Sequence, residues 1–254
     1  MASMLDAIIF AGPSLNAEAR ALCPSFRYLP PAAAGDMIRA TQAKPRMIGL
    51  IDGVFEACPS VWHKEILWAL SHGIHVFGAA SMGALRAAEL HVLGMVGVGR
   101  IFEDYRCGRL EDDDEVAVAH GPAETGFLAV SEAMVNIRYT LAAALDAAVI
   151  VPSLEQQLAR LAKATFFKTR AWTSILRDAR RLGEHADCLD AFSAWLPTGA
   201  IDQKRLDAIA ALHHMRRFLE TDPPPHRPAF SLARTPYFLA ALRRAGAGDF
   251  VPAA

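Results

Sequence analysis

Residues 76–93 read VFGAASMGALRAAELHVL. The short apolar run at 75–77 predicts a buried strand, and the small residues at 78–81 predict a tight turn after it. The alanine-rich stretch 83–93 predicts a helix that ends at Gly94 and lies close against a sheet. Together these segments predict one strand–turn–helix unit of a parallel α/β sheet, which decides the fold class.

The same alternation runs through the first half of the chain. Apolar runs at 7–11 and 47–51 also end in turn residues, the second of them in Asp52-Gly53, and residues 59–72 have the pattern of a helix. We therefore predict an α/β fold with a mostly parallel open sheet and flanking helices. The turns after the strands are expected at one edge of the sheet, where ligands bind in such folds.

The pattern changes after residue 149. Long segments with a 3.6-residue period replace the short strands, and the first of them predicts a helix from 152 to 182. We predict that residues 1–149 form an α/β core domain. Residues 150–254 are expected to form an α-helical C-terminal extension, which packs on the core or docks a partner.

Composition narrows the class of protein. The 254 residues include 26 basic and 27 acidic ones, so no global charge favours nucleic acid or anionic membrane. No run of ~18 apolar residues predicts a membrane span. Four scattered cysteines and the absence of a glycine-rich nucleotide motif favour a cytoplasmic protein with neither cofactor nor metal.

Ser81 lies at the predicted turn. The segment Ala79-Ala80-Ser81-Met82-Gly83 resembles the nucleophile elbow G-x-S-x-G, with alanine in the first glycine position. Small flanking residues allow a sharp turn that aims the first N–H groups of the helix at an anion. A serine at such a turn also caps helices, so the sequence leaves nucleophile, cap and anion-binding group open.

His63 comes early in the helix predicted at 59–72 and is the best candidate for a general base at the same edge. A histidine in this position is more often a surface or capping residue. Glu65 shares a helix row with apolar residues, so its carboxylate is expected to have a partner or a raised pKa. Arg86 and Glu89 stand three residues apart, either as a surface ion pair or with Arg86 binding an anion.

The segment from 111 to 136 contains further polar residues that could belong to a site. Residues 111–115 are all acidic, and we interpret them as a solvated loop, because contiguous carboxylates cannot all converge on one metal ion. His120 and Glu124 lie in the loop that follows. Asn136 belongs to the polar face of a helix predicted from 131 to 146, a face that is either exposed or site-lining.

Residues 52–141 resemble the core domain of the TfuA-like family. Long ordered motifs carry the resemblance, at residues 52–55, 61–67, 78–90, 94–95, 112–116 and 131–136. No resemblance is found from residue 150 onward.

The resemblance implies an association with YcaO enzymes, which activate peptide amide oxygens with ATP. TfuA-like proteins promote backbone thioamidation of ribosomally made peptides or of a methanogen enzyme. They help release sulfide from the thiocarboxylated C-terminus of a ubiquitin-like sulfur-carrier protein. The expected partners are the YcaO enzyme, the carrier and, indirectly, the precursor peptide.

Two hypotheses follow. In the first, the chain hydrolyses the carrier thiocarboxylate: Ser81 is the nucleophile or orients water, His63 is the base, and Glu65 or Glu124 orients it. The catalytic candidates are Ser81, His63, Glu65, His120 and Glu124, and the substrate-binding candidates are Asp52, Gly53, Lys64, Met82, Gly83, Arg86, Glu89 and Asn136. In the second hypothesis the chain is a non-catalytic module that docks carrier and YcaO enzyme together.

Overall fold

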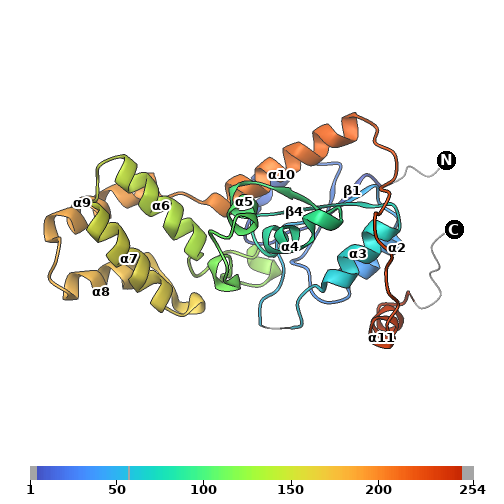
Figure 1. Ribbon diagram of the computed structural model, residues 1–254. Helices are drawn as coiled ribbons and strands as arrows, with labels where there is room; N and C mark the ends of the chain where they lie inside the picture. Colours follow the sequence, from blue (N-terminus) through green and yellow to red (C-terminus); the bar gives the residue numbers. More distant parts are fainter. Residues whose placement is uncertain (1–4, 57, 248–254) are drawn as a thin grey trace. The chain divides into compact units, whose positions relative to one another are not determined.

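A computed structural model describes residues 5–56 and 58–247 (Figure 1). Five parallel strands form one sheet in the order β2-β1-β3-β4-β5. They are β1 (Ala7–Phe10), β2 (Arg27–Leu29), β3 (Met47–Leu50), β4 (His75–Ala79) and β5 (Val96–Val98). The predicted fold class, a parallel open sheet with flanking helices and a helical C-terminal region, is confirmed.

Helices follow each strand, as a parallel sheet requires. These are α1 (Ala17–Arg20), α2 (Asp36–Gln42), α3 (His63–Ser71), α4 (Met82–Leu90) with the short η1 (His91–Leu93), and α5 (Arg100–Arg106). The chain reverses its direction across the sheet between β1 and β3, which are neighbours although β2 separates them in sequence. The crevice at such a reversal, outside the carboxyl ends of the strands, is where ligands bind in doubly wound sheets.

Two glycines allow α4 to lie directly on the sheet. A Cβ atom on Gly83 would stand 1.7 Å from the carbonyl oxygen of Leu50, and one on Gly78 would stand 2.2 Å from the carbonyl oxygen of Gly83. Neither backbone atom can give way, so only glycine fits both positions. The small residues of this element are therefore a packing requirement, and they place Ser81 against the ends of β3 and β4.

The helix α10 (Gln203–Glu220) returns to the sheet from the second half of the chain. Leu212 and Met215 are fully buried in the same cluster as Ile9 and Phe77 of the strands. α10 thus covers one face of the sheet, while α3 and α4 lie on the other (Figure 1). The last described helix is α11 (Pro236–Arg244), which packs against α2 and α3.

Residues of the chain divide into two compact units. Unit 1 comprises 1–110 and 205–254, and unit 2 comprises 111–204. These limits differ from the boundary predicted between 149 and 150. Helix α6 (Met134–Asp146) lies before that boundary and α7 (Pro152–Ala164) lies after it, yet the two helices share one hydrophobic core. Helix α10 packs on the sheet. Independent folding of residues 1–149 stays a prediction.

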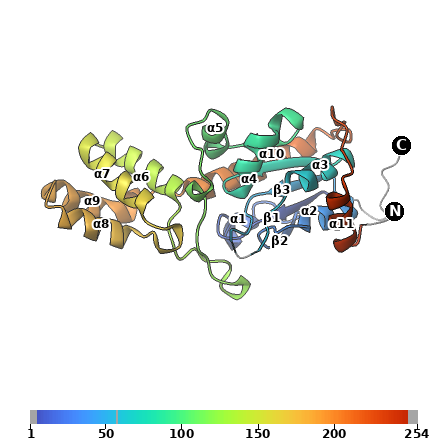
Figure 2. The same ribbon diagram turned by 60° about the horizontal axis from the view of Figure 1, so that its bottom comes forward.

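Unit 2 is helical (Figure 2). It contains η2 (Asp113–Glu115), η3 (Ala123–Thr125), α6 (Met134–Asp146), α7 (Pro152–Ala164), η4 (Phe167–Thr169), α8 (Trp172–Arg181) and α9 (Ala186–Gly199). The single helix predicted from 152 to 182 is interrupted, because Arg170 turns inward between η4 and α8 and is 0% exposed. None of the helices described at 5–56 and 58–247 is long and apolar enough to span a membrane.

Candidate functional site

The carboxyl edge of the sheet is closed by Asp52, which follows β3. Its Oδ2 accepts hydrogen bonds from the backbone N–H groups of Gly12 (2.8 Å) and Ser14 (3.0 Å), and its Oδ1 accepts from the Ser14 hydroxyl at 2.7 Å. Asp52 and Ser14 are both 2% exposed. The carboxylate therefore ties the loop after β1 to the loop after β3 and is itself almost inaccessible to solvent.

A strained turn joins β4 to α4. Ala80 adopts a φ of 65°, in the left-handed region that residues with a Cβ rarely occupy. Ser81 follows at 2% exposure, and its side chain makes no capping hydrogen bond to the first turn of α4. The predicted sharp turn is present. The simple capping role left open by the sequence is not realised, and the serine is buried instead of lifted into solvent.

The start of α4 offers fewer N–H groups to an anion than the sequence suggested. The Gly83 N–H donates to the carbonyl of Ile51 at 3.2 Å. The N–H groups of Ala84 and Leu85 donate to the Ser81 carbonyl. Met82 lies at 2% exposure against Gly53, where a Cβ would approach the Met82 side chain to 2.7 Å. The Gly53–Met82 contact is thus a packing contact that fixes the turn.

His63 forms a polar cluster with two residues of α4. Its Nε2 lies 2.8 Å from Oε2 of Glu89, which also accepts from Nη1 of Arg86 at 2.8 Å. Arg86 Nε donates to the Val61 carbonyl at 3.1 Å, and its side chain is only 15% exposed. Arg86 thus holds Glu89, which in turn holds the half-exposed imidazole. A carboxylate that orients one ring nitrogen leaves the other available as a base.

Sequence reasoning placed Glu89 among substrate contacts and missed it as the partner of His63. The signal was present in the motif: an Arg-x-x-Glu pair on the helix beside the one that starts with histidine. Glu89 lies eight residues after Ser81, which is about 12 Å along a helix. The imidazole therefore meets α4 two turns beyond the Ser81 turn, and the Ser81–His63 pairing stays a proposal.

Glu65 is buried at 1% exposure and binds backbone. Its Oε2 accepts from the Gly35 N–H at 2.7 Å, and its Oε1 accepts from the Trp62 N–H at 3.5 Å. Burial raises the pKa of this carboxyl to about 7, although the two backbone hydrogen bonds oppose the shift. The expected burial and raised pKa are confirmed, and these contacts join α2 to the start of α3.

Lys64, predicted to bind substrate, contacts the C-terminal part of the chain. Its Nζ donates to the Ala233 carbonyl at 3.1 Å and to the Thr235 hydroxyl at 3.2 Å. The same Nζ lies 5.9 Å from the centre of the Phe238 ring. The ammonium group is therefore already engaged by an intramolecular peptide segment.

The remaining candidates belong to unit 2 and are described there. Nδ1 of His120 lies 2.8 Å from the carbonyl of Gly121, and its ring contacts Phe127 edge to face. Glu124 is exposed in η3. Asn136 donates to Asp202 at 2.9 Å and accepts from the Lys204 N–H at 3.1 Å, so it ties α6 to the start of α10.

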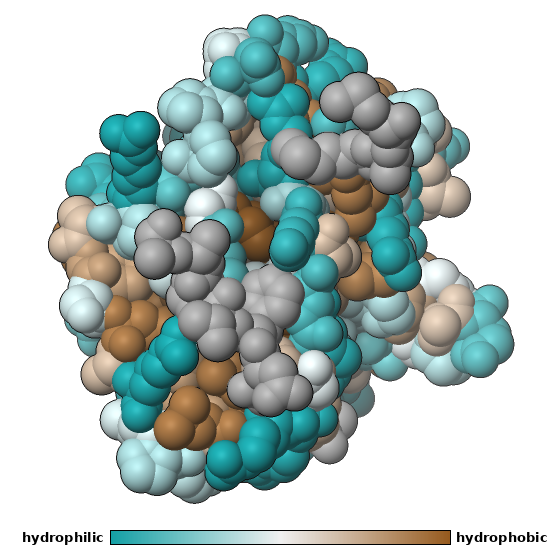
Figure 3. Space-filling model, turned by 90° about the vertical axis from the view of Figure 1, so that its right-hand side faces the viewer, coloured by the Kyte–Doolittle hydropathy of each residue, from teal (hydrophilic) through white to brown (hydrophobic). Residues whose placement is uncertain are grey.

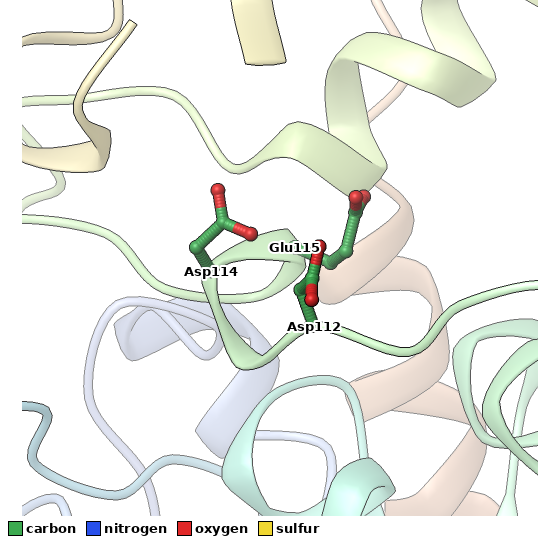
Figure 4. A group of neighbouring side chains, drawn as sticks. All are labelled: Asp112, Asp114 and Glu115. Atoms are coloured by element: carbon green, nitrogen blue, oxygen red, sulfur yellow. The ribbon is translucent and has the colours of Figure 1, made fainter. Parts of the chain in front are cut away.

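Three carboxylates of unit 2 have the proximity of a metal site. The ligand atoms of Asp112, Asp114 and Glu115 lie within 4.8 Å of one another (Figure 4). However, the Lys163 ammonium lies among them, 3.0 Å from Asp112 and 2.9 Å from Glu115, and also pairs with Asp114. The geometry is that of an ion-pair network. The interpretation as a solvated loop holds for Glu111, Asp112 and Asp113, which are exposed, but not for Glu115, which is 3% exposed.

Two arginines complete the network. Arg138 binds Glu115 through two hydrogen bonds of 2.8 and 2.9 Å, and the buried Arg170 binds Asp114 at 2.7 Å. Burial acts to raise the pKa of Asp114, but the hydrogen bonds and charges of Lys163 and Arg170 outweigh it and lower the pKa. The acidic motif thus serves to join η2 to α6, α7 and the start of α8.

The fold and the candidate groups define a doubly wound α/β protein with a polar cluster of His63, Glu89 and Arg86 between α3 and α4. Residues 52–171 match the family model described as TfuA-like protein, and this segment belongs to the TfuA-like family. The match extends beyond residue 141, where the resemblance seen in the sequence ended, and reaches Arg170. A comparison with curated proteins finds no match to the chain.

Proposed function

We propose that this protein delivers sulfur for YcaO-dependent thioamidation of a peptide backbone, by hydrolysing the C-terminal thiocarboxylate of a ubiquitin-like sulfur carrier. The observation that carries the proposal is the TfuA-like match over residues 52–171, which contains the strained Ala80–Ser81 turn and the His63–Glu89 pair. Both features lie on elements that start at the carboxyl edge of the sheet. The family association suggests the pathway, and the cluster suggests the chemistry.

The reaction needs an activated water and a place for a proton. Neutral His63 donates its Nε2–H to Glu89, which leaves the Nδ1 lone pair to accept a proton from water. The water oxygen then bonds to the thiocarboxylate carbon, the imidazolium returns the proton to the sulfur, and the carbon–sulfur bond breaks to release hydrosulfide. The carrier is left with a carboxylic acid, which loses its proton to solvent and becomes an ordinary carboxylate.

Arg86 and Ser81 have separate roles in this proposal. Arg86 donates a hydrogen bond to Glu89 and balances its negative charge. The Glu89 carboxylate can therefore orient the imidazole without binding another cation. Ser81 is a nucleophile only if the first turn of α3 moves toward it. Because its side chain is 2% exposed, we assign it to the turn that sets the direction of α4, with direct attack as the alternative.

Sulfide release from purified thiocarboxylated carrier tests these assignments. We expect His63→Ala and Glu89→Gln to lower the rate by about 100-fold, the usual contribution of a general base. His91→Ala is the matched control, because His91 is also an exposed histidine near the same helix, and its ring contacts the Ala88 carbonyl and the ring of Phe102. Unchanged release from His63→Ala would remove the base from the proposal.

A docking module without catalysis is the second candidate. The burial of Ser81 and the use of the Gly83 N–H by Ile51 favour it, since both reduce the groups available for chemistry. In that case the wild-type protein releases no sulfide by itself but still binds the carrier and the YcaO enzyme.

A further inference from the structure

The C-terminal segment of unit 1 lies across the surface of α3. After α10, residues 222–247, here called the strap, run past α3 to α11 (Figure 1). At the amino end of β4, the His226 N–H donates to the Gly73 carbonyl at 2.8 Å, and His75 Nε2 lies 2.9 Å from the Pro224 carbonyl. The strap therefore begins at the amino edge of the sheet and reaches the opposite end of α3.

At the first turn of α3 the strap is held as a peptide ligand would be. Lys64 donates to one strap carbonyl and one strap hydroxyl, those of Ala233 and Thr235. The Tyr237 ring stacks on Trp62 at 5.4 Å between centres, with an interplanar angle of 24°. Main-chain hydrogen bonds combined with an aromatic anchor are a recurring way of recognising peptides.

Helix α11 completes the contact through its apolar side. Phe238 and Leu242, one helical turn apart, are 1% and 3% exposed and pack on Ile38 of α2 and Trp68 of α3. Arg234 lies over the Trp68 ring at 5.8 Å. This cluster is separate from the one that α10 forms with the sheet, so the strap covers the outside of α2 and α3 without building the sheet core.

The strap is attached in a way that permits release. It begins with Asp222-Pro223-Pro224-Pro225, a stretch without regular structure. His226 Nε2 is buried with no hydrogen-bond partner among the described residues, which weakens this anchor. Tyr237 remains 69% exposed on its outer side. On the face that carries α2, α3 and α11, hydrophobic residues lie among hydrophilic ones (Figure 3).

We propose that Trp62, Lys64, Trp68 and Ile38 form a peptide-docking surface that the strap occupies in cis. The external partner is a polypeptide with an extended segment followed by a helix. It presents carbonyl oxygens to Lys64, an aromatic ring to Trp62, a cationic side chain to Trp68, and apolar side chains four residues apart to Ile38. It replaces the strap, so its binding is coupled to strap release. This proposal is independent of thiocarboxylate hydrolysis.

Competition between the strap and a free peptide of the same sequence tests the proposal on the full-length chain. A fluorescently labelled peptide of residues 230–247 is titrated with wild-type protein and with Phe238→Asp/Leu242→Asp, and its anisotropy is measured. We expect the double variant to bind the peptide at least about tenfold more tightly, because apparent affinity scales with the fraction of molecules whose surface is open. Arg243→Asp, on the exposed side of α11, should bind like wild type.

A second variant tests the same proposal without placing charged residues in the apolar contact of α11, where they could cause misfolding. Thr235→Val/Tyr237→Ala loosens only exposed contacts of the strap and should bind the peptide more tightly than wild type. A peptide with aspartate at both apolar positions should bind none of the proteins. If the variants keep the circular dichroism spectrum of wild type and bind the peptide no better, the strap is a fixed part of the core and the proposal fails.

Discussion

Gly83 lies where α4 comes closest to the sheet. Its place in a run of small residues predicted a tight turn, and the turn is there. The sequence could not show that Leu50 and Ile51 supply the surface and the carbonyl for this glycine, since both come from the preceding strand and the residue after it. The turn was predictable because its small residues are consecutive in the sequence. Its packing partners were not, because they lie about thirty residues earlier in the chain.

Gly83→Ala should therefore destabilise unit 1. The added Cβ meets a backbone oxygen that cannot move aside, and we expect a loss of about 3 kcal/mol in the free energy of unfolding. Gly183→Ala is the comparison: its φ of 75° disfavours alanine by about 1 kcal/mol, but nothing lies within 4 Å of the new Cβ, so it should cost less than Gly83→Ala. Urea unfolding compares the two. Equal effects would show that the close approach of α4 is not a constraint.

Glu65 makes stability depend on pH. Its folded pKa of about 7 lies above the value in the unfolded chain, so its stabilising contribution is complete below that unfolded value and is lost as pH rises through 7. Relative to Glu65→Gln, wild type should lose about 2 kcal/mol of unfolding free energy between about pH 5 and about pH 8. Parallel curves for the two proteins would contradict the raised pKa.

At the scale of elements, the ion-pair network of η2 depends on partners that are distant in the sequence. Five consecutive acidic residues predict a solvated loop, because contiguous carboxylates cannot all converge on one metal ion. Their cations, Lys163 and Arg170, come from about fifty residues later and meet them only after α6 and α7 have packed. Whether a run of charged residues is solvated or buried in ion pairs therefore depends on partners that the local sequence does not show.

Arg170→Met should destabilise unit 2 by about 3 kcal/mol or more, because it leaves a carboxylate and two backbone carbonyl groups without their partner. Arg177→Met is the matched control. Arg177 also pairs with an aspartate, but its side chain is 59% exposed, and such surface pairs contribute less than 1 kcal/mol. Thermal unfolding measures both, and equal melting temperatures would contradict a buried network.

At the scale of the whole molecule, the helices of the second half were predictable and their places were not. The periodicity of residues 202–220 predicts a helix, and α10 spans Gln203–Glu220. Its apolar side does not specify the surface that it contacts, so the sequence left packing on the core and docking of a partner open, and α10 in fact covers the sheet. The candidate site shows the same limit: His63 was found from its motif, but its partner Glu89 required the structure.

The strap gives unit 1 a second pH dependence. Burial and the neighbouring His75 lower the pKa of His226, so the folded state prefers the neutral ring. The resulting stabilisation is complete above the unfolded pKa and is lost as pH falls through it toward the folded value. From about pH 7.5 to about pH 5.5, the protection of residues 222–247 against hydrogen exchange, corrected for the slower intrinsic exchange at lower pH, should fall in wild type and much less in His226→Gln. Equal profiles would exclude His226 as the cause.

We propose that this protein itself converts a thiocarboxylate into a carboxylate. The most direct measurement is a single-turnover reaction of wild-type protein with thiocarboxylated carrier in isotopically labelled water, followed by sulfide detection and mass spectrometry of the carrier. The account predicts that one sulfide is released per carrier and that one oxygen of the new carboxylate comes from water. Release no faster than without the protein would contradict it.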